Sequence, residues 1–206
     1  NGSDYRLRYE KNDNLKITQA VAAYLADKED VQVIMTRSDD TFLSLEERTT
    51  FANQNNADYF VSLHRNTGEG NGVETWIRSD ADDKAQALAQ NIMDNLDAAG
   101  ISRNRGVKKG TQKSESKDYY VNLHTNMPAC IVELGFMNSP TDNQLFDANI
   151  DSYAKAIGDA VLKTYESYGK DGADAKESVE DVPGTEEQTS TETVSYTHLT
   201  LPTNRE

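Results

Sequence analysis

Two apolar, β-rich runs, each carrying one reactive side chain, constrain this chain more than any other feature. Residues 57–66 form a run with His64 near its end, and residues 127–136 form a second run that contains Glu133. The carboxyl ends of parallel strands meet at one edge of an α/β sheet, where ligands bind. A histidine and a carboxylate are side chains that hold or assist zinc. The pattern therefore favours an α/β fold with a zinc hydrolase site at the sheet edge.

Segments with helical and strand-like periodicity alternate along the rest of the chain. The helical segments are residues 13–27, 45–52, 82–99 and a closing helix with Tyr153, Ile157, Val161 and Tyr165 inward. The strand-like segments are residues 31–36, 57–64, 72–78, 119–123 and 129–134. Ser44 and Glu47 form a capping box, Gly100 ends a helix, and residues 103–118 read as a polar loop. This alternation predicts a three-layer α/β sandwich, with a mixed, mostly parallel sheet and helices on both faces.

Composition narrows the classes of function. The 206 residues, 36% of them hydrophobic, suffice for one good core, and the net charge of −14 argues against nucleic acid as a partner. No apolar stretch is long enough for a membrane span. The single cysteine, Cys130, cannot build a disulfide framework or a cysteine-based zinc site. No signal peptide is visible in a sequence that opens at Asn1.

The chain divides into three parts by composition. Residues 1–168 carry the alternating pattern and form the expected catalytic domain. Residues 169–193 are rich in Glu, Ser and Thr with almost no large apolar side chains, which is typical of an acidic, disordered linker. Residues 194–206 resemble one translated frame of a transposase-type sequencing adapter, so we expect this end not to be biological and to carry no chemistry.

Each candidate residue also has an ordinary structural explanation. A single histidine such as His64, at the end of a strand, is commonly a partly buried structural residue. A glutamate such as Glu10, just before a helix, commonly interacts only with solvent or the helix dipole. Glu133 is the most informative, because a carboxylate between Val132 and Leu134 is costly to bury unless it is paired, protonated or near a metal.

Several motifs, taken in order, resemble one family. These are residues 10–15 (EKNDNL), 35–40 (MTRSDD), 45–48 (LEER), 57–64 (ADYFVSLH), 72–75 (GVET) and 128–136 (PACIVELGF). Together they resemble the zinc-dependent N-acetylmuramoyl-L-alanine amidases of type 3, and the match continues to about Phe146. The set covers nearly the whole predicted domain and is far more specific than any one motif.

The resemblance implies a phosphorylase/hydrolase-like α/β fold that cleaves the amide between N-acetylmuramic acid and the L-alanine of the peptidoglycan stem peptide. It places Glu10 and His64 on two of the family's zinc ligands and Glu133 on its catalytic glutamate. The third ligand, a histidine, is expected just upstream of Asn1, together with the first strand of the sheet. A chain without them is expected to have a gap or an edge in its sheet and to be inactive.

The chemistry of this ligand set is consistent with hydrolysis. Two imidazoles and one carboxylate leave tetrahedral Zn²⁺ one open position, where the pKa of water falls to about 7. Glu133 would take the proton of this water and pass it to the leaving amine, an effect of roughly 10²–10⁴ in rate. Zn²⁺ is therefore the expected cofactor.

Three further residues are candidates for contact with the muropeptide: Arg65, Asn66 and His124. Arg65 replaces a small residue found in many members, and its simpler interpretation is a surface cation that offsets local acid. His124 stands where many members have a nearby arginine, and its simpler interpretation is a hydrogen-bonded loop residue. The four lysines of residues 108–117 either meet anionic wall polymer or form a solvated face.

The leading hypothesis is thus a monomeric peptidoglycan hydrolase, an autolysin or endolysin acting outside the cell at the wall. One alternative is a wall-binding domain that uses the same fold without catalysis. Another is a zinc peptidase of similar architecture. A histidine directly upstream of Asn1, or its absence, separates the enzyme from the binding domain, and the product released separates amidase from peptidase.

Overall fold

The computed structural model describes residues 8–29, 31–115, 117–168 and 194–200, the last as backbone. Within these residues a six-stranded sheet has the order β1-β6-β2-β5-β3-β4. Its strands are β1 (Val31–Met35), β2 (Tyr59–Asn66), β3 (Val73–Ile77), β4 (Asn104–Lys109), β5 (Ala129–Phe136) and β6 (Val194–Thr200). All neighbouring pairs are parallel except β3 and β5, which are antiparallel. The predicted mixed, mostly parallel sheet is confirmed.

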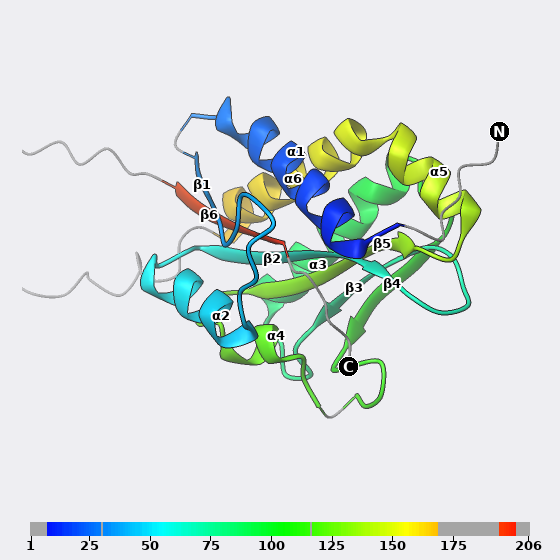
Figure 1. Cartoon of the computed structure of the whole chain (residues 1–206). Helices are drawn as coiled ribbons and strands as arrows, with labels where there is room; N and C mark the ends of the chain where they lie inside the picture. Colours follow the sequence, from blue (N-terminus) through cyan, green and yellow to red (C-terminus); the bar gives the residue numbers. More distant parts are fainter. Residues whose placement is uncertain (1–7, 30, 116, 169–193, 201–206) are drawn as a thin grey trace, which may run out of the picture.

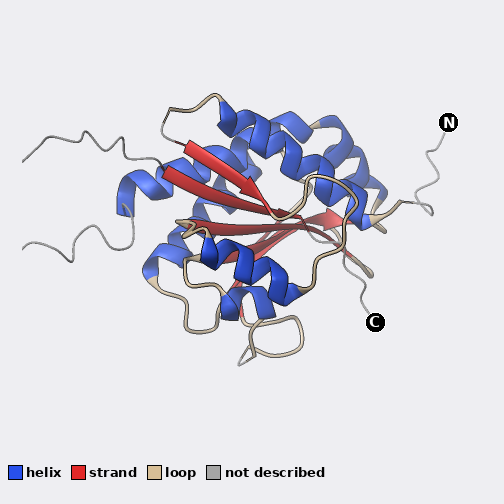
Figure 2. Ribbon diagram, turned by 60° about the vertical axis from the view of Figure 1, so that its left-hand side comes forward, coloured by secondary structure: helices blue, strands red, loops and turns tan. Residues whose placement is uncertain are grey.

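Helices cover the two faces of the sheet unequally (Figures 1 and 2). The helices of one layer are α1 (Glu10–Ala26), α3 (Asp83–Ala98) and α6 (Ile150–Tyr168), with α5 (Pro140–Ala148) beside β5. The other face carries two short helices, α2 (Leu45–Gln54) and α4 (Tyr120–His124). The three layers agree with the predicted sandwich.

Strand β2 shows how the sequence divides its side chains between these layers. Successive residues of a strand point to opposite faces of the sheet. Tyr59, Val61 and Leu63 accordingly join the large core beneath α1, α3 and α6, whereas Phe60 joins a smaller core with Trp76. Every residue of β2 and β5 is buried, as expected for central strands of a parallel sheet.

The ends of two predicted helices are confirmed in detail. At α2 the Ser44 hydroxyl accepts a hydrogen bond from the Glu47 amide, and the Glu47 side chain accepts one from the Ser44 amide, which completes the capping box. Gly100 follows α3 with a φ of 91°, a left-handed conformation that glycine adopts readily. In α6 Tyr153, Ile157 and Val161 are buried, and Tyr165 is partly buried.

Two predicted segments are wrong. Residues 103–118, predicted as a loop, contain β4, whose polar sequence fits an edge strand with one neighbour and partly exposed side chains. Residues 119–123, predicted as a strand, overlap the short helix α4, which runs from Tyr120 to His124. Five residues are too few to separate the two periodicities. The helix is held from outside, because buried Asn122 donates to the Trp76 carbonyl and Val121 packs beneath α2.

Strand β6 lies between β1 and β2 in the sheet. Residues 194–200 pair in parallel with β1 on one side and β2 on the other. A vacant place between two parallel strands presents backbone N–H and C=O groups that any extended segment can satisfy, whatever its side chains. This backbone placement does not test the expectation that residues 194–206 are not biological and carry no chemistry, which stays a prediction.

The predicted linker, residues 169–193, lies outside the described residues. Among the residues that are described, no helix is long and apolar enough to cross a membrane.

Candidate active site

Three ionisable side chains form a row across three neighbouring strands. His64 on β2 is in register with Glu133 on β5, and Glu133 is in register with Glu74 on β3. In-register partners on adjacent strands share a face of the sheet, about 4.8 Å apart in the hydrogen-bonding direction. The three side chains are buried, with exposed fractions of 4%, 4% and 2%. The row therefore lies close together on the face that α2 and α4 cover, away from the large core.

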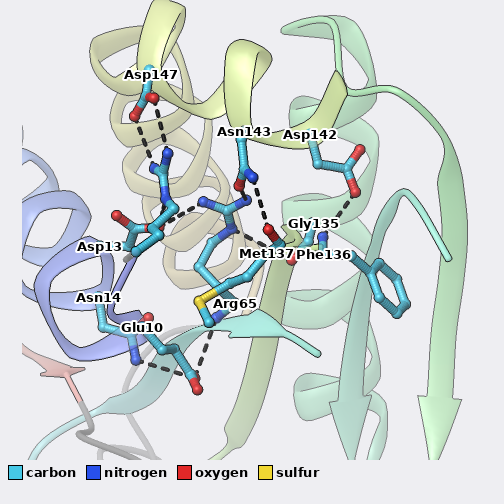
Figure 3. Close-up of polar contacts among 11 residues, drawn as sticks. Glu10, Asp13, Asn14, Arg65, Gly135, Phe136, Met137, Asp142, Asn143 and Asp147 are labelled. Carbon is cyan, nitrogen blue, oxygen red and sulfur yellow. Dashed lines mark hydrogen bonds and ion pairs between the residues drawn. The ribbon is translucent and has the colours of Figure 1, made fainter. Parts of the chain in front are cut away.

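Glu10, the first residue of α1, reaches this row from the helical layer. One of its carboxylate oxygens, Oε1, lies 2.9 Å from Nδ1 of His64. The same oxygen accepts longer hydrogen bonds of 3.4 Å from the Arg65 amide and from the side chain of Asn14. Figure 3 shows the last two contacts. The sequence separates Glu10 and His64 by 54 residues, and the fold brings them into direct contact.

The contact between Glu10 and His64 suits a shared zinc ion. Ligand atoms about 2.0 Å from a tetrahedral zinc lie roughly 3.3 Å from one another, close to the separation of these two atoms. The other ring nitrogen of His64 lies 3.0 Å from the Ser62 hydroxyl, an outer contact of the kind that orients a metal-binding imidazole. In the described part of the chain, no group of three or more His, Cys, Asp or Glu side chains is arranged so that it could hold a metal ion. Glu10 and His64 are thus a pair of donors that fits zinc and needs a further ligand.

Glu133 lies one strand away from the Glu10–His64 donor pair. It follows Val132 in a strand whose every residue is buried, and its register partner is His64. The assignment of Glu133 as a catalytic residue remains a prediction, but its position one strand away from the donor pair agrees with it.

Glu74 belongs to the same row and was not singled out from the sequence. Its carboxylate accepts hydrogen bonds from Asn66 Nδ2 and Trp76 Nε1, both at 3.1 Å, and from Arg105 Nε at 2.7 Å. The signal that marked Glu133, a carboxylate inside an apolar strand, is also present at Glu74 between Val73 and Thr75. The same reasoning could have found it.

Asn66, a predicted substrate contact, is held inside the site. Besides its bond to Glu74, its side-chain oxygen accepts from Gln112 Nε2 at 3.3 Å and from the Thr67 amide at 2.9 Å. Only 2% of the residue is exposed. In this arrangement its amide orients Glu74, and a direct contact with substrate stays a prediction.

Arg65 does not lie where either sequence interpretation placed it. The residue is 0% exposed, so the interpretation as a surface cation is wrong. Its guanidinium donates to Asp13 and to Asn143, each at 2.7 Å (Figure 3). Arg65 follows His64 in the strand and therefore points to the opposite face of the sheet. A buried, fully engaged side chain on that face gives no support to the predicted substrate contact.

His124 lies apart from the row. It is exposed at the end of α4, where its Nδ1 lies 2.9 Å from the Tyr120 carbonyl and its ring stacks on Tyr120. Its own carbonyl accepts from Asn53, near the end of α2 that leads into the start of β2. His64 is near the opposite end of that strand. The structure thus does not bring His124 to His64 or Glu133, and a role in substrate contact is unsupported.

A groove of about 650 Å³ opens next to the row. It is lined by Trp76, whose ring nitrogen binds Glu74, and by residues of β4 and the following loop, including Lys108, Lys109 and Lys113. A second hollow of about 200 Å³ lies beside residues 78–85 and 122–129 and contains none of the row. Cys130 is buried, and burial raises the pKa of its thiol, so it remains a neutral core residue.

Comparison with protein families gives an independent result. The sequence profile of the family described as N-acetylmuramoyl-L-alanine amidase matches residues 2–163. The match contains Glu10, His64, Glu74 and Glu133.

Individual proteins are similar to this chain over most of its length. The uncharacterized protein YqiI of Bacillus subtilis (strain 168) is 34% identical over 163 residues, which are 78% of this chain and 74% of YqiI. The probable cell wall amidase LytH of Staphylococcus epidermidis is 29% identical over 163 residues, which are 77% of this chain but 50% of LytH, so the chain spans half of that relative.

A solved structure shares both fold and sequence. The N-acetylmuramoyl-L-alanine amidase from Clostridium difficile 630 superposes with a TM-score of 0.74 at 33% identity, covering 82% of this chain and 90% of that one. The resemblance drawn from the sequence motifs is therefore confirmed. The chain belongs to the N-acetylmuramoyl-L-alanine amidase family.

Proposed function

We propose that this chain carries the catalytic domain of a zinc-dependent peptidoglycan amidase, which hydrolyses the amide between N-acetylmuramic acid and the L-alanine of the stem peptide. The observation that carries the proposal is the contact between Glu10 and His64, with Glu133 one strand away in register. Family membership supports the substrate class, because the matched family is described as N-acetylmuramoyl-L-alanine amidase and the relative LytH is named a probable cell wall amidase.

In this proposal Glu10 Oε1 and His64 Nδ1 hold zinc, which when bound supplies Lewis-acid activation of water and of the scissile carbonyl. Ser62 fixes the imidazole from its other nitrogen. The buried position of both donors keeps bulk water from competing for them.

Glu133 takes the proton of the attacking water and delivers it to the leaving amine of L-alanine. Its place inside a buried strand fixes the carboxylate. Glu74, tied to Asn66, Trp76 and Arg105, borders Glu133 on the far side from His64 and fixes the wall of the site next to the groove.

Two protein donors are too few to retain zinc in a catalytic site, where three are usual. We therefore propose that the 206-residue chain hydrolyses little by itself, and that a histidine supplied just upstream of Asn1 completes the site. We also propose that residues 1–168 are the catalytic unit, that it acts as a monomer outside the cell at the wall, and that residues 169–206 contribute no catalytic group.

The test compares three proteins on purified muropeptides: the chain, the chain extended upstream through the histidine, and the extended chain with Glu133→Gln. We expect the extended protein to bind one zinc and release peptides that begin with L-alanine. Glu133→Gln should retain zinc and lose roughly 10²–10⁴ of the rate. Glu46→Gln, which alters an exposed glutamate of α2, is the matched control and should behave as the unmodified protein.

Two outcomes would redirect the proposal. An extended protein that binds peptidoglycan but cleaves nothing would favour the wall-binding domain. Cleavage between amino acids of glycan-free stem peptides, without release from muramic acid, would favour the zinc peptidase.

A further inference from the structure

Arg65 is an unusual residue to find completely buried. Among the described residues it is the largest side chain with essentially no exposed surface. Arginine is rarely buried unless it is paired, because the loss of its hydration costs several kcal/mol. It also comes directly after His64, one of the two proposed zinc ligands. Its contacts show what this costly placement achieves.

One set of contacts joins Arg65 to the first turn of α1 (Figure 3). Its Nη1 donates to Asp13 Oδ2 at 2.7 Å, and Arg8 forms an ion pair with the same oxygen. The backbone amide of Arg65 points at Glu10 Oε1, 3.4 Å away. A single residue of β2 therefore contacts both the proposed ligand Glu10 and the residue three positions after it.

A second set of contacts fixes the other side of the guanidinium. Nη2 donates to Asn143 Oδ1 of α5 at 2.7 Å, and Nε lies 3.4 Å from the Gly135 carbonyl at the end of β5. Asn143 in turn donates to the Met137 carbonyl at 2.8 Å. The guanidinium carbon lies 4.3 Å from the centroid of the Phe146 ring. Arg65 is thus anchored in the β5–α5 connection.

Glu10 needs such an anchor more than His64 does. His64 lies in a central strand paired on both sides. Glu10 is the first residue of α1, and the residue at the N-cap, Tyr9, makes no side-chain capping bond. A helix start without a cap leaves its amides unsatisfied and frays more easily. Of the two ligands, Glu10 therefore depends on tertiary contacts for its position.

We propose that Arg65 is a positioning residue that holds Glu10 in place for zinc by clamping the first turn of α1, through Asp13, to the β5–α5 connection. This inference rests on the proposed function, because it takes Glu10 and His64 as the zinc ligands. Arg65 acts through Asp13 and touches neither metal nor substrate.

Removal of the Arg65 side chain has two opposing effects on zinc affinity, one from the loss of its charge and one from the loss of its contacts. Loss of a buried positive charge next to the site would by itself make the site more favourable for a cation. Loss of the clamp would make Glu10 a poorer ligand. We expect the second effect to prevail, with zinc affinity reduced roughly 10–100-fold, the range found when outer partners of metal ligands are removed.

The experiment measures zinc binding to the chain extended upstream through the histidine, by competition with a chromophoric chelator, for the extended chain without substitution, Arg65→Met, Asp13→Asn and the double variant. Each single variant should weaken zinc binding. The double variant should be weakened by far less than the product of the two, because both changes break the same contact. Arg65→Lys, which keeps the charge but not the forked donors, should fall between the extended chain without substitution and Arg65→Met.

A matched control separates positioning from general destabilisation. Leu88→Ala removes a fully buried side chain of α3 that belongs to the large core and lowers stability without touching α1's first turn. It should leave zinc affinity within a factor of two. Amide hydrogen exchange of the metal-free chain should show faster exchange in the first turn of α1 for Arg65→Met and not for Leu88→Ala.

The outcomes distinguish the inference from the function on which it rests. If the extended chain binds zinc and its Arg65→Met variant binds it equally or more tightly, or if Leu88→Ala weakens it as much, the positioning role is wrong and the zinc site stands. If the extended chain without substitution binds no zinc, the proposed function fails. Unchanged exchange in the first turn of α1 would then also overturn the clamp.

Discussion

The first turns of α1 and α2 are stabilised in opposite ways. Helix α2 starts with a complete capping box, two hydrogen bonds between residues three positions apart in the sequence. Helix α1 starts without a side-chain cap and is held by a buried arginine from β2. The helix whose start is set by tertiary contacts is the one that carries a proposed metal ligand. The position of the first turn of α1 is therefore set by contacts with β2, the strand that carries His64, and not by the local sequence.

The largest effect on stability is expected at Gly135, whose carbonyl lies 3.4 Å from Nε of Arg65. Its φ of 87° is left-handed, and a Cβ there would lie 2.8 Å from Asp142 Cβ. Asp142 accepts hydrogen bonds from the Phe136 and Gly72 amides. Gly135→Ala combines the cost of the conformation with that of the clash, roughly 2–5 kcal/mol of unfolding free energy in urea titrations.

Gly100→Ala is the matched control for that change. Its φ of 91° is similar, but nothing lies within 4 Å of the added Cβ, so only the conformational cost of about 1–2 kcal/mol is expected. Equal losses for the two variants would show that the β5–α5 connection yields easily and cannot anchor Arg65.

The capping box of α2 should have a smaller effect and no influence on the site. Ser44→Ala removes the hydroxyl that accepts from the Glu47 amide and should cost about 1 kcal/mol in a urea titration. Zinc affinity should not change, because no part of this cap contacts α1's first turn. Thr50→Ala, an exposed change within the same helix, should cost less. A loss of zinc binding in Ser44→Ala would contradict the separation of the two helix starts.

The smallest effect concerns the pH dependence of the unfolding free energy. It arises from Asp147 of α5, which pairs with Arg8, and Arg8 also binds Asp13 in the first turn of α1. Hydrogen bonds from Arg8, outweighing desolvation, hold the pKa of Asp147 below its ordinary value of 3.8. The unfolded chain therefore takes up this proton first as the pH falls. The contribution of Asp147 to the unfolding free energy is complete well above pH 3.8 and is lost as the pH falls through its folded pKa.

Asp147→Asn should accordingly flatten the acid side of the plot of unfolding free energy against pH, by a small amount because the side chain is 46% exposed. Asp94→Asn, in α3, controls for the loss of one negative charge. An acid limb that is unchanged in Asp147→Asn would show that the Arg8 ion pair contributes nothing measurable.

The sequence predicted the parts of the fold that depend on local patterns. The capping box at Ser44, the strand ending near His64 and the buried stripe of α6 are set by residues close together in the chain, and all three are confirmed. The α1 helix was predicted from residue 13, whereas it begins at Glu10. That start has no local signal, because Arg65 supplies its anchor from 52 residues away.

The segments that failed depend on partners distant in the sequence. Edge strand β4 has a polar sequence that gives no strand pattern, and its strand conformation depends on pairing with β3. Helix α4 is short and is held by Trp76 and α2. At the site, the sequence did not indicate that Arg65 is buried. Its partners Asp13 and Asn143 lie in α1 and α5, 52 and 78 residues away in the chain. Glu74 was recognisable, since it interrupts an apolar strand as Glu133 does.

The most direct test of the central claim, that Glu10 and His64 form one metal site, is zinc stoichiometry in the chain extended upstream through the histidine. We expect one zinc per chain in the unmodified protein and in Glu133→Gln. Glu10→Gln and His64→Ala should each lose the ion, with similar losses because they remove two ligands of one site. Retention of zinc at unchanged affinity in either of these two variants would contradict the claim.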